Sequence, residues 1–338
     1  MKRLWLMCVL LVLCTSCTTA NKTQMEKITF FAMDTVMEIQ GEGENCQTAL
    51  EKAEQEIYRL ESLLTLQKAD SDAVKLQEAA GKEWITVDAS TAVLLEQGRA
   101  LWEETDGAFD LTVEPVTKAW GFGTDHPAVP NQNTIADALS LVNGGAIFVQ
   151  GTQAMLEQEG MAVDFGGIAK GYAADRAAEV LRENGITAGI LSLGGNVRVF
   201  GEKADGSLWH VGVQDPQDAS ALLGIVTLSD GSVVTSGGYQ RNFTENGKTY
   251  HSIMDPKTGY PAESGLLSVT IVCQDGTRAD GLSTALFVMG EEKAIDFWKQ
   301  YTDFEMILAT EDGRLLVSEG LSFSDASGQY EMAILQRN

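Results

Sequence analysis

The sequence predicts an α+β protein in which mixed sheets are flanked by helices. Stretches that alternate between apolar and polar residues, as strands do, are interspersed with stretches whose apolar residues recur at helical spacing. The two kinds of stretch follow no sustained strand–helix–strand rhythm, which argues against a doubly wound parallel sheet. With 44% hydrophobic residues, the chain can form a real core. We expect one compact unit, or two interlocked subdomains, over residues 27–338.

Each predicted element rests on a local pattern. In the N-terminal half we expect a strand over 27–40 and a helix over 49–64. A second helix should begin at a cap formed by Asp88 or Ser90 and end at Gly107, and a third should lie near 135–141. A Gly- and Pro-rich loop over 115–130 separates the second helix from the third. In the C-terminal half, residues 163–200 predict a strand, a glycine loop, a helix and a strand, with the helix at 169–184 and Gly185 as its C-terminal cap. Several strands follow up to Val272. The chain then continues with helices from Asp280 and over 291–301 and ends with strands around Met306 and Leu315.

The first residues predict a lipoprotein signal peptide over 1–17. A positively charged start precedes an apolar run over 4–13, which is too short to span a bilayer. Small residues stand directly before Cys17, so Cys17 is predicted to become the lipidated first residue of the mature chain. Ordinary secretion with cleavage nearby is the alternative. The small, polar residues that follow suit a tether over 18–26.

Charge and cysteine content limit the partners. A net charge of −24 argues against nucleic-acid binding, which requires a basic face. The same charge disfavours adsorption to anionic lipid, so the lipid on Cys17 would have to supply membrane attachment. Beyond the predicted signal peptide only Cys46 and Cys273 remain, and they either pair or pack as small core residues.

A glycine-rich stretch, Asp-Phe-Gly-Gly-Ile-Ala-Lys-Gly at residues 164–171, stands directly before a predicted helix. Glycines let a backbone pass close to a phosphate or a metal, and a helix N-terminus attracts negative charge. The stretch is not a Walker loop, because Lys170 is followed by Gly171 and Tyr172. It indicates either a phosphate site or a tight turn that is glycine-rich for packing.

Asp280 and Thr284 lie four residues apart in a predicted helix, so their oxygens project from one face. A carboxylate and a hydroxyl form a hard-oxygen pair suited to Mg²⁺, which accepts few protein ligands and keeps room for phosphates. On the residues alone, the simpler alternative is that Asp280 caps the helix and Thr284 has no special role.

Two further segments combine turn chemistry with reactive or aromatic side chains. His251 precedes the turn sequence Asp-Pro-Lys-Thr-Gly at 255–259, where it is a general base, a phosphate contact or an incidental surface residue. The glycine-flanked aromatic residues of 107–115 and 120–123 either line a slot for a planar ring or anchor loops to the core. The chain has no Gly-x-Ser-x-Gly elbow and no dinucleotide-binding fingerprint.

Taken in order, these segments resemble the FAD:protein FMN transferase family, often called ApbE. The resemblance covers nearly the whole mature chain and implies an ApbE-like flavin transferase fold. It rests on Met-Asp-Thr at 33–35, Gly-Ala-Phe-Asp-Leu-Thr-Val at 107–113, Trp-Gly-Phe-Gly at 120–123, residues 164–175, Gly-Gly-Asn at 194–196, Ser-Gly-Gly-Tyr at 236–239, Asp-Pro-Lys-Thr-Gly at 255–259 and Ala-Asp-Gly-Leu-Ser-Thr-Ala at 279–285.

The resemblance implies an extracytoplasmic enzyme, lipid-anchored on the periplasmic or outer cell surface. Such an enzyme splits FAD, transfers FMN through its phosphate to a Thr or Ser hydroxyl of a flavoprotein, releases AMP and requires Mg²⁺. Carried over by position, the FAD contacts are Met33, Ala108, Phe109, Asp110, Asp164 and Lys170, and the metal ligands are the Gly167 carbonyl, Asp280 and Thr284. The resemblance therefore favours a metal-binding role for Asp280 over helix capping. Asp280 is also our candidate for a catalytic residue.

The sequence departs from the family pattern in two places. The family's histidine usually stands three residues before the Asp of Asp-Pro, where this chain has Ser252, so His251 is our candidate for the catalytic or phosphate-contacting role. The family also often has an aromatic residue after the first long helix, where this chain has Thr65, Leu66 and Gln67.

Three functions are therefore compared. The leading one is FMN transfer, with an acceptor that, by resemblance, belongs to a sodium-pumping or Rnf-type redox complex or is a related extracellular flavoprotein. The alternatives are an FAD pyrophosphatase that gives FMN and AMP, and a lipid-anchored flavin-binding protein without turnover.

Overall fold

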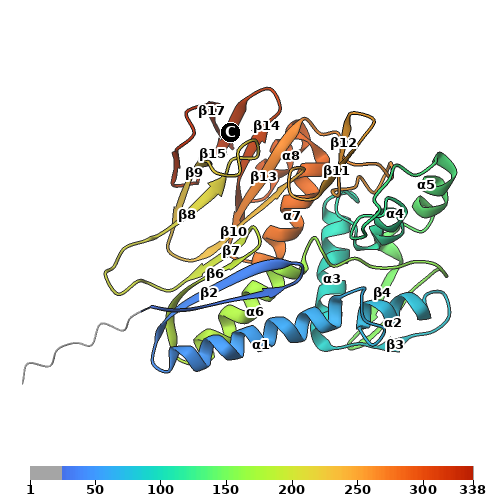
Figure 1. Ribbon diagram of the computed structural model, residues 1–338, viewed down its shortest axis with the longest axis horizontal. Coiled ribbons are helices and arrows are strands. Elements are labelled where there is room, and N and C mark those ends of the chain that lie inside the picture. The colour runs from blue at the N-terminus through green and yellow to red at the C-terminus, as the bar shows by residue number, and fades with distance from the viewer. Residues whose placement is uncertain (1–24, 338) are drawn as a thin grey trace, which may run out of the picture.

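Helices and strands alternate irregularly along the chain, which confirms the predicted α+β fold class (Figure 1). The structure is a computed structural model and describes residues 25–337. The helices are α1 (Cys46–Leu64), α2 (Asp72–Ala79), α3 (Ala89–Glu104), α4 (Glu114–Ala119), α5 (Gln132–Leu139), α6 (Ala169–Glu183), α7 (Gly276–Met289) and α8 (Glu291–Gln300). Two short 3-10 helices, Leu111–Val113 and Gly144–Ala146, accompany them.

The strands belong to four sheets. They are β1 (Glu26–Ala32), β2 (Thr35–Gly43), β3 (Ile85–Thr86), β4 (Ile147–Gln150), β5 (Gln153–Leu156), β6 (Ile186–Leu193), β7 (Asn196–Phe200), β8 (Trp209–Gln214), β9 (Leu222–Leu228), β10 (Gly231–Gly237), β11 (Asn242–Glu245), β12 (Lys248–His251), β13 (Leu266–Cys273), β14 (Phe304–Thr310), β15 (Arg314–Ser318), β16 (Phe323–Asp325) and β17 (Glu331–Leu335).

One nine-stranded sheet forms the centre of the protein, in the order β1-β2-β6-β7-β10-β13-β14-β15-β17. Its neighbouring strands are antiparallel except β15 and β17. Helices α1, α6, α7 and α8 pack on one face, and the sheet β16-β9-β8 packs on the other. Side chains alternate between the two layers: in β14, Met306 and Leu308 face the helices, whereas Ile307 and Ala309 face the small sheet.

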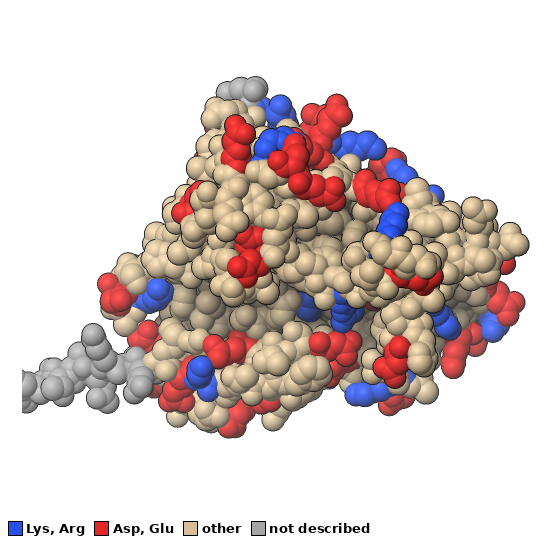
Figure 2. Space-filling view, turned by 45° about the horizontal axis from the view of Figure 1, so that its top comes forward, with Lys and Arg blue, Asp and Glu red and all other residues tan. Residues whose placement is uncertain are grey.

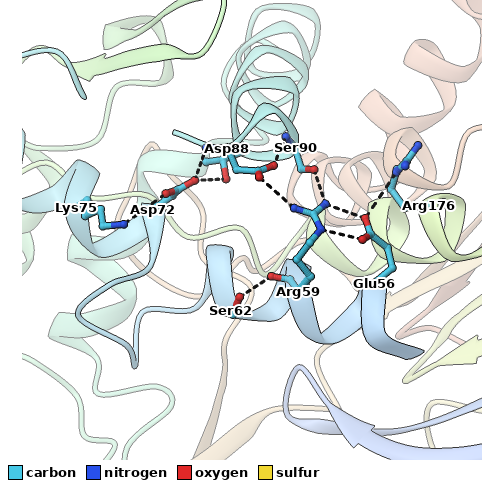
Figure 3. Close-up of polar contacts among 9 residues, drawn as sticks. Glu56, Arg59, Ser62, Asp72, Lys75, Asp88, Ser90 and Arg176 are labelled. Carbon is cyan, nitrogen blue, oxygen red and sulfur yellow. Dashed lines mark hydrogen bonds and ion pairs between the residues drawn. The ribbon is translucent and has the colours of Figure 1, made fainter. Parts of the chain in front are cut away.

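Helices α2 to α5 and the sheet β3-β5-β4 form a lobe at one end of the molecule (Figure 1). A polar network joins this lobe to α1 (Figure 3). Arg59 of α1 contacts Ser90 Oγ at 2.9 Å and Asp88 at 3.1 Å, at the start of α3. Asp72 of α2 accepts hydrogen bonds from Asp88 N at 2.7 Å and from Thr91 Oγ1 at 2.8 Å. The network fixes the N-terminus of α3 against α1 and α2.

The predicted strand over 27–40 is a hairpin of β1 and β2, so the prediction was wrong about its connectivity. Met33 and Asp34 form the two-residue turn, with φ of 46° and 60°. Two-residue hairpin turns usually contain Asn-Gly, Asp-Gly or Gly-Gly, and this turn contains no glycine. The last strand predicted within 163–200, which covers 190–200, is likewise a hairpin that turns at Gly194 and Gly195 between β6 and β7.

Other differences concern segments whose conformation depends on distant partners. The stretch around Val163 is buried but is not a strand, and Asp164 N instead donates to Leu111 O at 2.8 Å. Helix α4 occupies the first part of the loop predicted over 115–130, and α2, β16 and β17 were not predicted. Cys46 and Cys273 are both buried and free, so they pack in the core and do not pair.

The N-terminal predictions fall mainly outside the described residues. The signal peptide over 1–17, its Cys17 and most of the tether over 18–26 lie there. Strand β1 begins at Glu26, one residue before the predicted start of the domain. Within residues 25–337, no helix is both long and apolar enough to cross a membrane.

Candidate active site

Helices α6 and α7 meet where the two most specific sequence motifs come together. The backbone N of Gly171 in α6 donates a hydrogen bond of 2.9 Å to Asp280 Oδ2 in α7. A Cβ on Gly171 would lie only 2.1 Å from the carbonyl oxygen of Gly276, so the close approach requires glycine. The fold therefore joins the glycine-rich motif at 164–175 to the motif at 279–285.

Asp280 does not cap its own helix, so the capping alternative is wrong. Helix α7 begins at Gly276, and its cap is Asp275, which accepts a hydrogen bond from Arg278 N at 2.9 Å. Asp280 lies one turn further along and is 3% exposed. Its hydrogen bond with Gly171 uses one carboxylate oxygen and leaves the other for a ligand.

Hydroxyl groups cluster around Thr284, one turn further along α7. Ser236 Oγ of β10 lies 3.3 Å from Thr284 Oγ1 and 2.7 Å from Ser283 Oγ. Ser283 also donates to the backbone carbonyl of Asp280 at 2.8 Å. On the side of α6, a Cβ on Gly167 would lie 3.6 Å from Thr284 Oγ1. The three predicted metal-ligating residues thus lie side by side.

This donor set fits a small, hard cation that is shared with a phosphate. Within residues 25–337, no three acidic, histidine or cysteine side chains form a metal site by themselves. One buried carboxylate (Asp280), one hydroxyl (Thr284) and the backbone of Gly167 are oxygen donors, too few for an all-protein Ca²⁺ site. Mg²⁺ is usually held in this way, by one or two protein side chains together with substrate phosphates.

The glycine-rich loop before α6 is well ordered by local hydrogen bonds. Asp164 N donates to Leu111 O, and Asp164 Oδ1 accepts from Gly166 N at 2.7 Å. Lys170 Nζ lies 3.1 Å from the carbonyl oxygen of Gly166. The residue that precedes α6 gives the helix no side-chain cap, and Asp280 of α7 is the partner of one of its first amides. The positive end of the helix dipole beside Lys170 favours an anionic ligand.

Residues 108–110 are buried and are used by the fold itself. The ring of Phe109 contacts Gly167, whose Cβ would lie 3.1 Å from it. The carboxylate of Asp110 accepts a hydrogen bond from Gly144 N at 2.9 Å, and burial raises the pKa of Asp110. The predicted FAD contacts of this segment, and of Asp164 and Lys170, stay predictions.

A pocket of about 330 Å³ lies between this segment and the turn at 255–259. Asp106 and Lys257, which both line it, form an ion pair of 2.6 Å. The aromatic residues of 120–123 do not line it: Trp120 is fully buried, and its Nε1 donates to Gly259 O at 2.9 Å. Of the two interpretations of that segment, core anchoring is therefore correct for Trp120.

The turn at Met33 lies beside two other motifs. A Cβ on Gly194 would lie 2.5 Å from Thr35 Cγ2, and Arg241 contacts Asp34 at 3.5 Å. The turns at 33–35 and 194–196 and the segment that follows β10 therefore meet at one edge of the sheet. Met33 is half-buried there, and its contact with FAD also stays a prediction.

His251 ends β12 and faces α7. Its ring lies edge-on to Phe287, with centroids 5.4 Å apart, and its Nε2 is 3.1 Å from the carbonyl oxygen of Ala262. A carbonyl oxygen can only accept a hydrogen bond, so Nε2 carries the proton and Nδ1 of the neutral ring is unprotonated. Nδ1 is buried and has no hydrogen-bond partner. Burial lowers the pKa of His251, which favours the neutral ring. The neighbouring Ser252 is half-buried, and its N donates to Arg241 O.

Three polar residues of this region were not predicted. Glu114 is half-buried, and burial together with the charge of Asp164 raises the pKa of Glu114 to about 7. Ser236 belongs to a quoted motif but had no assigned role, and Ser283 directly precedes Thr284. Only the raised pKa depends on three-dimensional burial alone, so no sequence pattern could have indicated it.

The charge distribution agrees with an anionic substrate. Figure 2 shows acidic and basic side chains over this face of the molecule, and Lys or Arg side chains also lie in the hollow that crosses it. Basic groups in a hollow attract anions.

Comparisons with known proteins agree on one family. The ApbE family model matches residues 33–308. An FAD:protein FMN transferase of Klebsiella pneumoniae is 36% identical over 281 residues, which cover 82% of this chain and 87% of the relative. One from Treponema pallidum is 33% identical over 291 residues, covering 81% and 80%.

Solved structures give the same result. The ApbE protein of Thermotoga maritima matches with a TM-score of 0.81 and 34% identity, covering 88% of this chain and 98% of that one. The Pseudomonas stutzeri flavinyl transferase ApbE, in its apo form, matches with a TM-score of 0.78 and 26% identity, covering 90% and 95%. The motifs, the fold and both kinds of comparison converge, and this chain belongs to the ApbE family.

Proposed function

We propose that this protein transfers FMN from FAD to a Thr or Ser hydroxyl of an acceptor flavoprotein, with the help of Mg²⁺ and with release of AMP. The observation that carries the proposal is the meeting of Gly167, Asp280 and Thr284 beside the start of α6. Its curated relatives are named for this transfer.

The chain's own residues have distinct tasks in this proposal. Asp280, Thr284 and the Gly167 carbonyl would hold Mg²⁺, which when bound neutralises charge on the pyrophosphate and on the leaving AMP. Lys170 and the positive end of the α6 dipole attract the pyrophosphate. Transfer to a hydroxyl then requires in-line placement of the acceptor more than an unusually reactive nucleophile.

The decisive experiment mixes the protein with FAD, Mg²⁺ and a recombinant flavoprotein domain of an Rnf-type or sodium-pumping complex, our proposed class of acceptor. Mass spectrometry measures covalent FMN on the domain, and chromatography measures AMP. Attachment with one AMP per FMN supports transfer. Free FMN and AMP without attachment would show a pyrophosphatase, and FAD binding without AMP would show a flavin-binding protein.

The metal assignment has its own test. Asp280→Ala should abolish metal-dependent AMP release, whereas Asp296→Ala, which removes an exposed carboxylate from α8, should not affect it. Undiminished transfer by Asp280→Ala would refute the metal role of that residue.

We further propose that Cys17 carries a lipid that anchors the protein outside the cytoplasm. In the producing bacterium, an alkyne-labelled fatty acid should label the wild type and Cys8→Ala, but not Cys17→Ala, because Cys8 lies in the part that the peptidase removes. Equal labelling of the Cys17→Ala variant would exclude this anchor.

A further inference from the structure

We infer that Asp175 is a positioning residue for the reaction: it sets the orientation of α7 and thereby places Asp280 opposite Gly167. The inference rests on the proposed metal-dependent transfer, because it assigns Asp175 a role through the proposed metal ligand Asp280.

Helices α6 and α7 each supply a carboxylate to an amide in the first turn of the other. Asp175, in the second turn of α6, accepts hydrogen bonds from the backbone N of Thr277 at 3.1 Å and from its Oγ1 at 3.4 Å. Asp280, in the second turn of α7, accepts from Gly171 N in the first turn of α6. Each carboxylate thus binds an amide at the start of the other helix, where amides lack partners within their own helix. The exchange fixes the two helices relative to each other at both points.

The contact between these first turns leaves almost no space. A Cβ on Gly276 would lie 2.8 Å from Asp175 Oδ1, and a Cβ on Gly171 would lie 2.1 Å from Gly276 O and 2.8 Å from Asp280 Cβ. Gly276 therefore touches the Asp175 carboxylate on one side and Gly171 on the other. A shift of α7 that follows loss of Asp175 must change the position of Asp280.

The central sheet holds Asp175 in turn. Arg198 of β7 is 7% exposed, and its Nε lies 3.4 Å from Asp175 Oδ1. The same guanidinium contacts Asp230 at 2.9 Å on its other side. Burial raises the pKa of Asp175 to about 6, so keeping a carboxylate here opposes stability at neutral pH. A half-buried charge that the fold retains at such a cost is best explained by its effect on geometry.

The test compares three variants of the full chain. Asp175→Ala removes both the cap on Thr277 and the ion pair with Arg198, and Asp175→Asn keeps an oxygen for the cap but loses the charge. Asp230→Asn is the matched control, because it removes the other carboxylate from Arg198 and does not touch α7. Mn²⁺, followed by the electron paramagnetic resonance of the free ion in the presence of FAD, serves as the probe for the metal site, and AMP release gives kcat and KM.

For Asp175→Ala we expect the Mn²⁺ dissociation constant to rise and kcat to fall, each by about 10–100-fold, with KM for FAD changed much less. Asp175→Asn should recover part of both losses, and it provides the test if the alanine variant does not fold. Asp230→Asn should keep the wild-type Mn²⁺ affinity even if its melting temperature falls. Wild-type Mn²⁺ affinity and kcat in a folded Asp175 variant, or equal losses in Asp230→Asn, would overturn the inference alone. Absence of Mn²⁺ binding to the wild type would overturn the proposed metal site and the inference with it.

Discussion

One added methyl group at Gly171 should damage both the fold and the site. In Gly171→Ala, the new Cβ would lie 2.1 Å from the Gly276 carbonyl oxygen and 2.6 Å from its carbon. These are backbone atoms that cannot rotate away. An ordinary contact between carbon and oxygen is about 3.3 Å, so α6 and α7 must separate locally by roughly 1 Å.

The size of the effect follows from opposing contributions. Overpacking of a tight interior costs about 1–3 kcal/mol, whereas alanine is favoured over glycine in a helix by about 0.5–1 kcal/mol. Separation also lengthens the hydrogen bond between Gly171 N and Asp280, and such bonds to charged groups contribute about 1.5–3 kcal/mol. We therefore expect a net destabilisation of about 2 kcal/mol. A displacement of roughly 1 Å at Asp280 should lower the rate of AMP release by about 100-fold.

Urea unfolding monitored by circular dichroism and AMP release at saturating Mg²⁺ measure the two effects. Gly281→Ala is the control within α7, because its Cβ would meet one side-chain methyl, Leu101 Cδ1, at 2.4 Å, and that methyl can move. The control should lose less stability and much less activity. If Gly171→Ala unfolds at the wild-type urea concentration and releases AMP at the wild-type rate, the close contact of α6 and α7 is not required, and the reasoning is refuted.

Three further predictions concern the surroundings of the site. Burial and the charge of Asp164 raise the pKa of Glu114 from 4.5 to about 7, so the folded state retains a proton that the unfolded chain releases. The free energy of unfolding therefore falls as pH rises from 4.5 to 7. In Glu114→Gln, the difference in this free energy between urea unfolding at pH 5 and at pH 8 should be smaller than in the wild type by about 2 kcal/mol. Trp120→Phe leaves the buried carbonyl of Gly259 without its donor and should cost about 1–3 kcal/mol, measured by the same unfolding assay. Arg59→Ala removes the half-exposed guanidinium that joins α1 to the start of α3. The free energy of unfolding should fall by about 1 kcal/mol, and the rate of AMP release should not change. A fall in the rate of AMP release would contradict a purely structural role of Arg59.

The sequence predicted those elements whose signals are local. Helix α6 is an example, because its apolar periodicity and the glycine at 185, which has a φ of 83°, mark its body and its end within one or two residues. The hairpin at Met33 was missed for the opposite reason: two non-glycine residues adopt positive φ there, and sheet pairing rather than local preference stabilises the turn. The stretch around Val163 has the composition of a strand, but it has no neighbouring strand to pair with, which only the topology reveals.

The positions of the candidate site residues on their elements could be predicted from the sequence, but the contacts between those elements could not. The spacing of Asp280 and Thr284 correctly places both on one helix, and the family pattern joins them to the glycine-rich loop. The hydrogen bond between Gly171 and Asp280 spans 109 residues of sequence, and no periodicity or propensity indicates such a contact. Asp175 was quoted as the end of a motif, yet its role depends on where the start of α7 lies.

The contacts between the first turns of α6 and α7 bear on two choices that the residues alone left open. The glycine-rich loop was either a phosphate site or a tight turn, and Asp280 was either a helix cap or a metal ligand. Asp280 binds the Gly171 amide in the first turn of α6, whereas Asp275 caps α7. In the proposed metal site, the second oxygen of Asp280 would be a ligand together with Thr284 and Gly167. Only glycine lets α7 bring its carboxylate to the start of α6, so the tight glycine turn is a condition for the proposed phosphate site. In that proposal one carboxylate both binds the Gly171 amide and holds the metal, and that is why a change at Gly171 or Asp175 should be detected as a change at Asp280.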